Sequence, residues 1–381
     1  MSAPQHLLVV TTNFAETHGG VQAHLAELLP RLVERGVATT VAYLGERTEP
    51  YAVDGVSVVP LRRRVDLKEV IGLPGPREWA AFVGRVRRGG LPAGPVSVVA
   101  THTRFFPMSG LGVRLGHRLG VPVVHTEHGA GSVVTGSALV EAGSRGVDAT
   151  MGRWVLRHAD RVVGVSAEVV GFVRQLAGVD AVMIPNGIDV DRWLGGVEPA
   201  DAGVGDARPL VFVGRVVAEK GWEDFLSVAR TVGERTGVSR PVHVVGDGPD
   251  LPRAQDTARA WGLDVRWHGR LESDGIKAVL HDAVYVNPSV AAEGFQLTQL
   301  EALLSGAAVV SYDVGVAREL ETSGVGDVHV VPRGDLARLA EAAVAAVGRA
   351  PSHPTQADVR RWDWETVADD YAAVLSSAGP R

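Results

Sequence analysis

The sequence contains no cysteine among its 381 residues. This absence excludes disulfide bonds, thiolate nucleophiles and cysteine-ligated metal centres, and it fits a reducing compartment. The sequence also lacks a run of about 20 uncharged apolar residues, the length that a membrane-spanning helix needs. Its first residues show no basic segment followed by a long apolar run, so we expect no signal peptide and a cytoplasmic protein.

The composition is otherwise that of a globular protein, with 45% hydrophobic and 22% charged residues, and the length predicts two domains. The net charge of −6 is unevenly placed: residues 1–190 hold 19 Lys and Arg against 16 Asp and Glu, whereas the remainder holds 19 against 28. Residues 61–118 carry 11 basic and 3 acidic side chains. This segment indicates either a solvated basic face, which we favour, or an anionic partner.

Short β-rich runs alternate with amphipathic helical stretches, a pattern typical of parallel sheets with helical crossovers. A Gly-, Asp-, Pro- and Ala-rich stretch at 195–209 is typical of a linker. The pattern predicts two similar α/β domains, over 1–190 and 191–362, followed by a final amphipathic helix. The predicted strands are Leu7–Thr12, Ala38–Tyr43, Val56–Pro60, Val96–Thr101, Val121–Thr126, Arg161–Val165, Ala181–Ile184, Leu210–Val213, Val242–Val245, Val265–Trp267, Ala283–Val286, Val309–Tyr312 and Val328–Val331.

Two carboxylates eight residues apart, Glu293 and Glu301, give the strongest chemical signal. Glu293 lies in a loop after a predicted strand, and Glu301 lies one to two turns into a helix that starts near 295–297. The free N–H groups of that helix end would hold an anion while the loop carboxylate binds a polyol. Spacing alone favours a simpler alternative, a helix N-terminal acid followed by a solvent-facing acid.

Cations and glycines mark other strand ends. Arg215 and Lys220 lie between a strand and a helix, where they would clamp a diphosphate or serve as surface cations. Gly246-Asp247-Gly248 resembles half of a dinucleotide fingerprint, but Leu251 stands where a third glycine belongs, so we predict no NAD. Gly19-Gly20, before a helix, allows close approach of a phosphate or makes a simple turn.

The run His125-Thr126-Glu127-His128-Gly129 follows a strand that has the pattern of a buried one. Two histidines and a carboxylate suggest a metal, but His125 and Glu127 share one face of an extended chain and His128 lies beyond them. Because no other ligand cluster is evident, we predict no metal. A single histidine facing a cleft, His128, is the favoured interpretation.

These motifs occur in a fixed order along the chain: Gly19-Gly20-Val21, His128-Gly129, Pro185-Asn186-Gly187-Ile188-Asp189, Gly214-Arg215, Lys220-Gly221, Gly246-Asp247-Gly248, and Glu293 with Glu301. The ordered set resembles the family 4 retaining glycosyltransferases of the GT-B fold over nearly the whole chain, most weakly at 45–95. The resemblance implies two Rossmann-like domains facing across an interdomain cleft, with the nucleotide-sugar donor in the second. It also implies a C-terminal helix, about 363–381, that crosses back to the first, acceptor-binding domain.

The resemblance also implies a role for each matching residue. Glu293 would bind the donor sugar, Glu301 the ribose, and Arg215 with Lys220 the leaving diphosphate. Further donor contacts are implied for Gly19, Gly20, His128, Gly246, Arg270, Gly294, Phe295, Gln296, Leu297 and Thr298, with His128, Glu293, Arg215 and Lys220 serving catalysis. Gln296 stands where the family often has glycine, so the donor sugar remains open.

The expected activity is hexosyl transfer (EC 2.4) from a UDP- or GDP-sugar, without metal or other cofactor, because cations and N–H groups stabilise the leaving diphosphate. The expected acceptor is a sugar, aminocyclitol, natural product, or phosphorylated or lipid-linked molecule, and no nucleic acid. A nucleotide-sugar epimerase of the same shape and a non-catalytic nucleotide-sugar-binding protein remain alternatives. Peripheral contact with an anionic inner membrane face also remains open, with Trp79–Val86 as an interfacial helix or, more simply, core.

Overall fold

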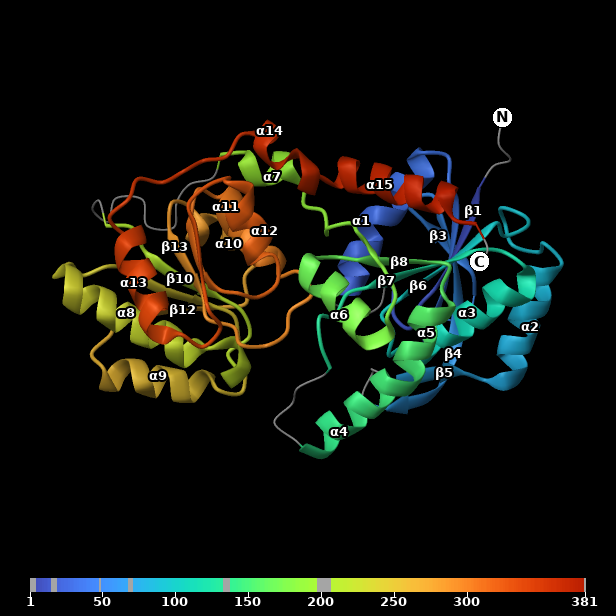
Figure 1. The fold of residues 1–381 in the computed structure, drawn as a ribbon, viewed down its shortest axis with the longest axis horizontal. Helices are drawn as coiled ribbons and strands as arrows, with labels where there is room; N and C mark the ends of the chain where they lie inside the picture. Colours follow the sequence, from blue (N-terminus) through green and yellow to red (C-terminus); the bar gives the residue numbers. More distant parts are fainter. Residues whose placement is uncertain are drawn as a thin grey trace. The chain divides into compact units, whose positions relative to one another are not determined.

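The computed structural model describes residues 5–14, 19–47, 49–67, 71–132, 138–196 and 207–379. The chain divides into two compact units, Met1–Gly187 with Trp364–Arg381, and Ile188–Asp363 (Figure 1). The division at Gly187 precedes the predicted linker at 195–209, of which residues 197–206 lie outside the described residues. Both units are α/β, as the alternation of patterns predicts.

The first unit is built on a sheet of strand order β3-β4-β2-β1-β6-β7-β8-β9, with β5 paired to β4. The pairs are parallel except for β3 with β4 and β4 with β5. The strands are β1 (His6–Val10), β2 (Ala38–Gly45), β3 (Tyr51–Val53), β4 (Val56–Leu67), β5 (Ile71–Pro74), β6 (Val98–His102), β7 (Val123–Glu127), β8 (Arg161–Gly164) and β9 (Val182–Met183).

Helices of the first unit bury the apolar faces that the sequence predicts. In α1, which contains Pro30, the residues Leu25, Leu28, Leu29 and Leu32 are buried against the sheet in one hydrophobic cluster. The helices are α1 (Gly20–Glu34), α2 (Pro76–Arg87), α3 (Pro107–Leu119), α4 (Ala138–Val147), α5 (Arg153–His158), α6 (Ala167–Ala177) and α15 (Trp364–Ser377), and a π-helical turn spans Asp148–Gly152.

The second unit has a wholly parallel sheet of order β12-β11-β10-β13-β14-β15. Its strands are β10 (Leu210–Val213), β11 (Val242–Val245), β12 (Val265–Gly269), β13 (Val284–Asn287), β14 (Ala308–Tyr312) and β15 (Val328–Val331). Its helices are α7 (Val190–Leu194), α8 (Trp222–Thr236), α9 (Leu251–Ala260), α10 (Ser273–Leu280), α11 (Leu297–Leu304), α12 (Ala317–Ser323), α13 (Leu336–Ala346) and α14 (Gln356–Val359), with 3-10 turns at Ala218–Lys220 and Arg360–Trp362.

The C-terminal helix α15 packs into the first unit beside α1. Arg35 of α1 forms ion pairs with Glu365 (2.9 Å) and Asp369 (2.7 Å) of α15. At the start of α15, the Trp364 ring lies so close to Gly187 that a Cβ on that glycine would stand 2.3 Å from a ring carbon. The glycine of the Asn-Gly turn is therefore required by contact with a residue 177 positions away along the printed sequence.

Replacing Gly187 by alanine should lower the free energy of unfolding of the first unit by about 1 to 3 kcal/mol, because the indole must move out of a packed position. Gly171→Ala is the matched control, since Gly171 lies within α6 and a Cβ there meets no atom within 4 Å. Alanine in that helix should be neutral or stabilise by up to about 1 kcal/mol. Urea unfolding of both variants measures this, and equal stabilities would contradict the packing argument.

Candidate functional site

Two neighbouring strands of the second unit, β10 and β13, deliver charged side chains to one edge of the sheet. They are parallel partners, so the loops after their carboxyl ends lie close together. Lys220 ends the 3-10 turn after β10, and its Nζ lies 2.5 Å from Oε1 of Glu293, in the loop after β13. Both side chains are about three-quarters buried or more, at 24% and 20% exposed. This burial and pairing are unlike those of a free surface cation.

Backbone contacts hold these two loops against each other. The amides of Val290 and Ala291 donate to the carbonyl of Glu219, at 3.0 and 3.3 Å. Gly221 has φ +74°, and a Cβ on it would stand 2.1 Å from the carbonyl oxygen of Pro288. The position after Lys220 therefore accepts only glycine, and this close approach fixes Lys220 beside the loop that carries Glu293.

The helix α11 begins four residues after Glu293, without a side-chain cap. Its N-cap residue, Gln296, has left-handed backbone angles, φ 55° and ψ 75°. The first N–H groups of a helix, here those of Leu297 and Thr298, have no carbonyl partner within the helix, and the helix dipole places partial positive charge on them. Glu293 and these N–H groups belong to the loop and helix start after β13, and the ion pair brings Lys220 to them from the loop after β10. This combination suits a ligand that joins a phosphate to a polyol.

The Gln296 side chain explains how a non-glycine residue is held in this conformation. Its Oε1 accepts hydrogen bonds from Asn287 (2.8 Å) and Gln299 (2.9 Å). Both donors also bond Ser311 Oγ, and Gln299 Nε2 donates to the Val314 carbonyl. Gln299 and Ser311 are fully buried, so this is an internal amide network. Gln296 thus holds, through its side-chain hydrogen bonds, the left-handed backbone conformation that glycine adopts freely.

Glu301 lies one turn into α11 and is partly buried. Burial raises the pKa of its carboxyl to about 7, against a smaller opposing effect of a hydrogen bond with Thr298. The partial burial of Glu301 favours the site carboxylate over the alternative of a solvent-facing acid. A desolvated carboxylate near a helix start accepts hydrogen bonds from ligand hydroxyls with little competition from water.

The other residues predicted for the second unit lie at carboxyl ends of its strands. Arg215 and Arg270 are exposed just after β10 and β12. Gly246 and Gly248 allow close packing of the backbone. A Cβ on Gly246 would stand 2.0 Å from the carbonyl oxygen of Gly214, and one on Gly248 would stand 2.3 Å from that of Val216. The Gly-Asp-Gly motif thus brings two strand-end loops together.

In the first unit, Gly19 and Gly20 stand at the start of α1. A Cβ on Gly20 would meet no atom within 4 Å among the described residues, and its φ does not require glycine. The neighbouring residues 15–18 lie outside the described chain. Protein packing in the described part therefore gives no reason for glycine at this position, which is compatible with close approach of a ligand.

A buried ion-pair network that sequence reasoning missed positions His128. Arg104, fully buried, pairs with Glu127 (2.9 Å) and Asp148 (2.9 Å). Glu127 in turn accepts from the backbone amides of His128 (3.1 Å) and Gly129 (2.9 Å). Burial alone would raise the pKa of the Glu127 carboxyl, but Arg104, His125 and the Gly129 amide together lower it to about 2. Glu127 thus remains ionised and fixes the turn after β7.

The His128 ring contacts other histidines, and this too was not predicted. Its Nε2 lies 3.1 Å from Nδ1 of His102, at the end of β6, and the ring of His24 in α1 lies 5.0 Å away, centroid to centroid. Burial, followed by the mutual repulsion of the rings, lowers the pKa of His102 and His128 well below the ordinary value, and burial lowers that of His24 to about 4. All three rings are neutral at physiological pH.

The basic segment 61–118 is only partly a solvated face. Arg62, Arg64, Arg77, Arg87 and Arg88 are exposed, and Lys68 lies outside the described residues. Arg63 instead donates to Asn13 Oδ1 at 2.7 Å. In α2, Phe82 and Val86 are buried, which favours the core interpretation of the apolar stripe. No helix in the described ranges has the length and apolar character needed to cross a bilayer.

Two family models match the chain, one in each half. The model described as Glycosyltransferase Family 4 matches residues 18–192, and the one described as Glycosyl transferases group 1 matches residues 207–348. Together they cover the Gly19-Gly20 and His128 motifs and the Lys220, Glu293 and Glu301 site. The order of motifs that suggested the resemblance is therefore matched by independent models of both halves.

Two relatives whose names describe them as glycosyltransferases, and one solved structure, are similar to this chain. A 2-deoxystreptamine N-acetyl-D-glucosaminyltransferase of Streptomyces fradiae is 35% identical over 53% of this chain, which spans half of that protein's length. A D-inositol 3-phosphate glycosyltransferase of Geodermatophilus obscurus is 28% identical over 94% of this chain and 85% of its own. Among solved structures, Anabaena HepE, in complex with UDP and glucose, superposes with a TM-score of 0.68 at 17% identity, covering 98% of this chain and 100% of that one. The last match shows the fold.

The left-handed Gln296 predicts an unusual ranking of variants. Gln296→Ala and Gln296→Gly both remove the amide network, but alanine also retains a Cβ at positive φ. Gln296→Ala should therefore be less stable than Gln296→Gly by about 1 kcal/mol in chemical unfolding. The usual order, with alanine the more stable, would show that this backbone conformation is not the one in solution.

The raised pKa of Glu301 predicts that the free energy of unfolding decreases as the pH rises. Since the folded-state pKa is about 7 and the ordinary value is 4.5, the stability associated with the protonated carboxyl is fully present below pH 4.5 and lost as the pH rises through 7. Thermal unfolding of wild type and Glu301→Gln between pH 4.5 and 8.5 tests this. The wild type should lose on the order of 2 kcal/mol relative to the variant across that range, whereas parallel profiles would contradict the shift.

Proposed function

The chain belongs to the family 4 glycosyltransferases and has their GT-B fold, and from this we propose that it transfers a hexose-type sugar from a UDP- or GDP-linked donor to an acceptor hydroxyl, with retention of anomeric configuration. The observation that supports this best is the Lys220–Glu293 pair beside the uncapped start of α11. It combines an ammonium, a carboxylate and free N–H groups, the groups that a sugar diphosphate requires.

In the proposed mechanism, the bond between the anomeric carbon and the diphosphate oxygen breaks while the acceptor oxygen attacks the same face. The departing phosphate oxygen takes the acceptor's proton. Lys220, Arg215 and the N–H groups of Leu297 and Thr298 stabilise the charge that develops on the leaving diphosphate. Glu293 accepts hydrogen bonds from sugar hydroxyls, and Glu301 does so from the ribose.

In this mechanism, Lys220 and Glu293 pair with each other before the donor binds and with the donor afterwards. Without donor, each charge satisfies the other at 2.5 Å. When donor binds, the ammonium turns to the diphosphate and the carboxylate to the sugar hydroxyls, so neither charge is left unpaired in a partly buried place. Because Lys220 and Arg215 would neutralise the leaving group, we propose that transfer needs no metal ion.

For the acceptor we propose a cyclitol or aminocyclitol of small size. Two relatives are named for such compounds, 2-deoxystreptamine and inositol 3-phosphate. The exposed arginines of the basic segment, Arg62, Arg64, Arg77, Arg87 and Arg88, leave room for a phosphorylated acceptor as well. A membrane surface is less well supported, since Phe82 and Val86 of the apolar stripe of α2 are buried in the protein.

The function is tested by incubating the protein with UDP- and GDP-hexoses, with and without 2-deoxystreptamine or inositol 3-phosphate, in the presence of excess EDTA. We expect nucleotide diphosphate release and an α-glycoside from an α-linked donor, dependent on acceptor. Conversion of the donor sugar without acceptor would favour an epimerase instead. Binding without turnover would favour a non-catalytic protein, and loss of transfer in EDTA would contradict metal independence.

Lys220→Ala should lower kcat by about 100-fold or more with a smaller effect on donor KM, because the ammonium acts mainly on charge that develops at the leaving group. Arg338→Ala is the matched control, since Arg338 is an exposed cation of α13 in the same unit, 65% exposed. Steady-state kinetics of both variants measure this. Unchanged kcat/KM in Lys220→Ala with a lowered melting temperature would show that the lysine has only a structural role.

A further inference from the structure

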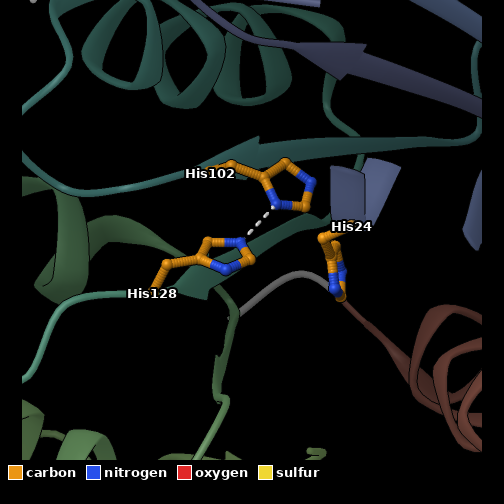
Figure 2. Close-up of side chains that lie close together, drawn as sticks. All are labelled: His24, His102 and His128. Carbon is orange, nitrogen blue, oxygen red and sulfur yellow. Dashed lines mark hydrogen bonds between the residues drawn. The ribbon is translucent and has the colours of Figure 1, made fainter. Parts of the chain in front are cut away.

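Three histidines from distant parts of the sequence meet inside the first unit (Figure 2). His24 lies in α1, His102 at the end of β6, and His128 just after β7. One ring nitrogen from each lies within 4.8 Å of the other two. In Figure 2 the rings of His102 and His128 face each other across their 3.1 Å contact, and the His24 ring stands beside them.

The His24 ring differs from the other two rings of the cluster in the hydrogen bonding of its nitrogens. It is buried, and among the described residues neither of its nitrogens makes a hydrogen bond of ordinary geometry. The Asn186 side chain, whose Oδ1 is likewise without a partner among these residues, lies near enough to oppose the lowering of the His24 pKa by burial. Trp364 and Tyr371 of α15 pack against it, with ring centroids 5.6 and 5.5 Å away. A buried polar atom without a partner is unfavourable, and native proteins usually resolve it with a water or an ion. Packing alone would be served better by phenylalanine.

We propose that His24, His102 and His128 form a binding site for one divalent transition-metal ion, of which Zn²⁺ is the representative. Three imidazoles without a carboxylate or thiolate suit Zn²⁺, Co²⁺, Ni²⁺ or Cu²⁺, and do not suit Mg²⁺ or Ca²⁺, which prefer oxygen. A fourth position remains for water, as in three-histidine zinc sites.

The three ring nitrogens need to move only a small distance to bind one metal ion. Nitrogens bound to one tetrahedral Zn²⁺ at 2.0–2.1 Å lie about 3.3 Å apart, and the His102–His128 pair is already at 3.1 Å. The His24 nitrogen needs to approach by up to about 1.5 Å, within reach of side-chain rotation. His102 must carry its remaining proton on Nε2, which frees Nδ1 for the ion.

Charge beside the cluster suits a cation. Arg104, Glu127 and Asp148 form a buried group with one positive and two negative charges, a net of −1. Glu127 holds the backbone amide of His128 at 3.1 Å, so this negative group adjoins one of the three ligands directly. Through this backbone contact Glu127 fixes the position of the residue that carries the His128 ring.

Metal binding would have a consequence that rests on the proposed function. If His128 contacts the donor sugar, an ion that takes its Nε2 withdraws it from that role. Zn²⁺ should therefore inhibit transfer, although transfer itself needs no metal. The site would act as an inhibitory one.

Cobalt is the probe, because tetrahedral Co²⁺ absorbs visible light. Titration of the metal-free 381-residue chain should show one Co²⁺ per chain, displaced by Zn²⁺. His24→Phe and His102→Gln should each weaken Co²⁺ binding by at least about 100-fold. His24→Phe should remain folded, since it fills the same volume without unpaired nitrogens. The control is His268→Gln, because His268 pairs with His243 at 2.9 Å in a two-histidine contact of the second unit.

Unchanged binding in His268→Gln together with loss in both cluster variants supports the site. Absence of Co²⁺ binding by wild type, or full binding by folded His24→Phe, would overturn it. Inhibition by Zn²⁺, measured relative to each variant's own metal-free rate, tests the consequence separately. A protein that transfers no sugar but binds Co²⁺ through these histidines would refute the proposed function and leave the metal site standing.

Discussion

The left-handed backbone of Gln296 determines what the start of α11 can do. This residue turns the chain before a helix start that has no side-chain cap, and Glu293, three residues earlier, pairs with Lys220. The conformation is unfavourable for a residue with a Cβ, and the amide network through Asn287 and Gln299 offsets that cost. A helix terminus, a cation and a carboxylate are thereby held in one small region.

The signals that mark this region in the sequence are local. Strand, glycine turn and helix follow one another around Lys220 and again around Glu293, and parallel pairing of β10 with β13 brings both loops to one sheet edge. The start of α11 lies where periodicity places it, and the family membership is borne out. Spacing alone favours a solvent-facing Glu301, whereas the fold leaves this residue only partly exposed and burial raises its pKa.

The histidine cluster and the Arg104 network were beyond prediction for a physical reason. His24, His102 and His128 belong to three different elements, and only the order of strands β1, β6 and β7 in the sheet brings them together. His128 was singled out for its place after a strand, but its partners carry no local motif. The same holds for Gly187, whose glycine is fixed by Trp364 at the other end of the chain. Long-range contacts of this kind become visible only when the fold is known.

The central claim is that the second unit binds the nucleotide diphosphate at the loops of Lys220 and Glu293. Hydrogen–deuterium exchange with and without UDP or GDP tests it most directly, because the free N–H groups of α11 are themselves the proposed ligands. The account predicts slowed exchange in peptides covering 215–221 and 293–301 when nucleotide is bound. Unchanged exchange in both segments at saturating nucleotide, with protection elsewhere in the chain, would contradict it.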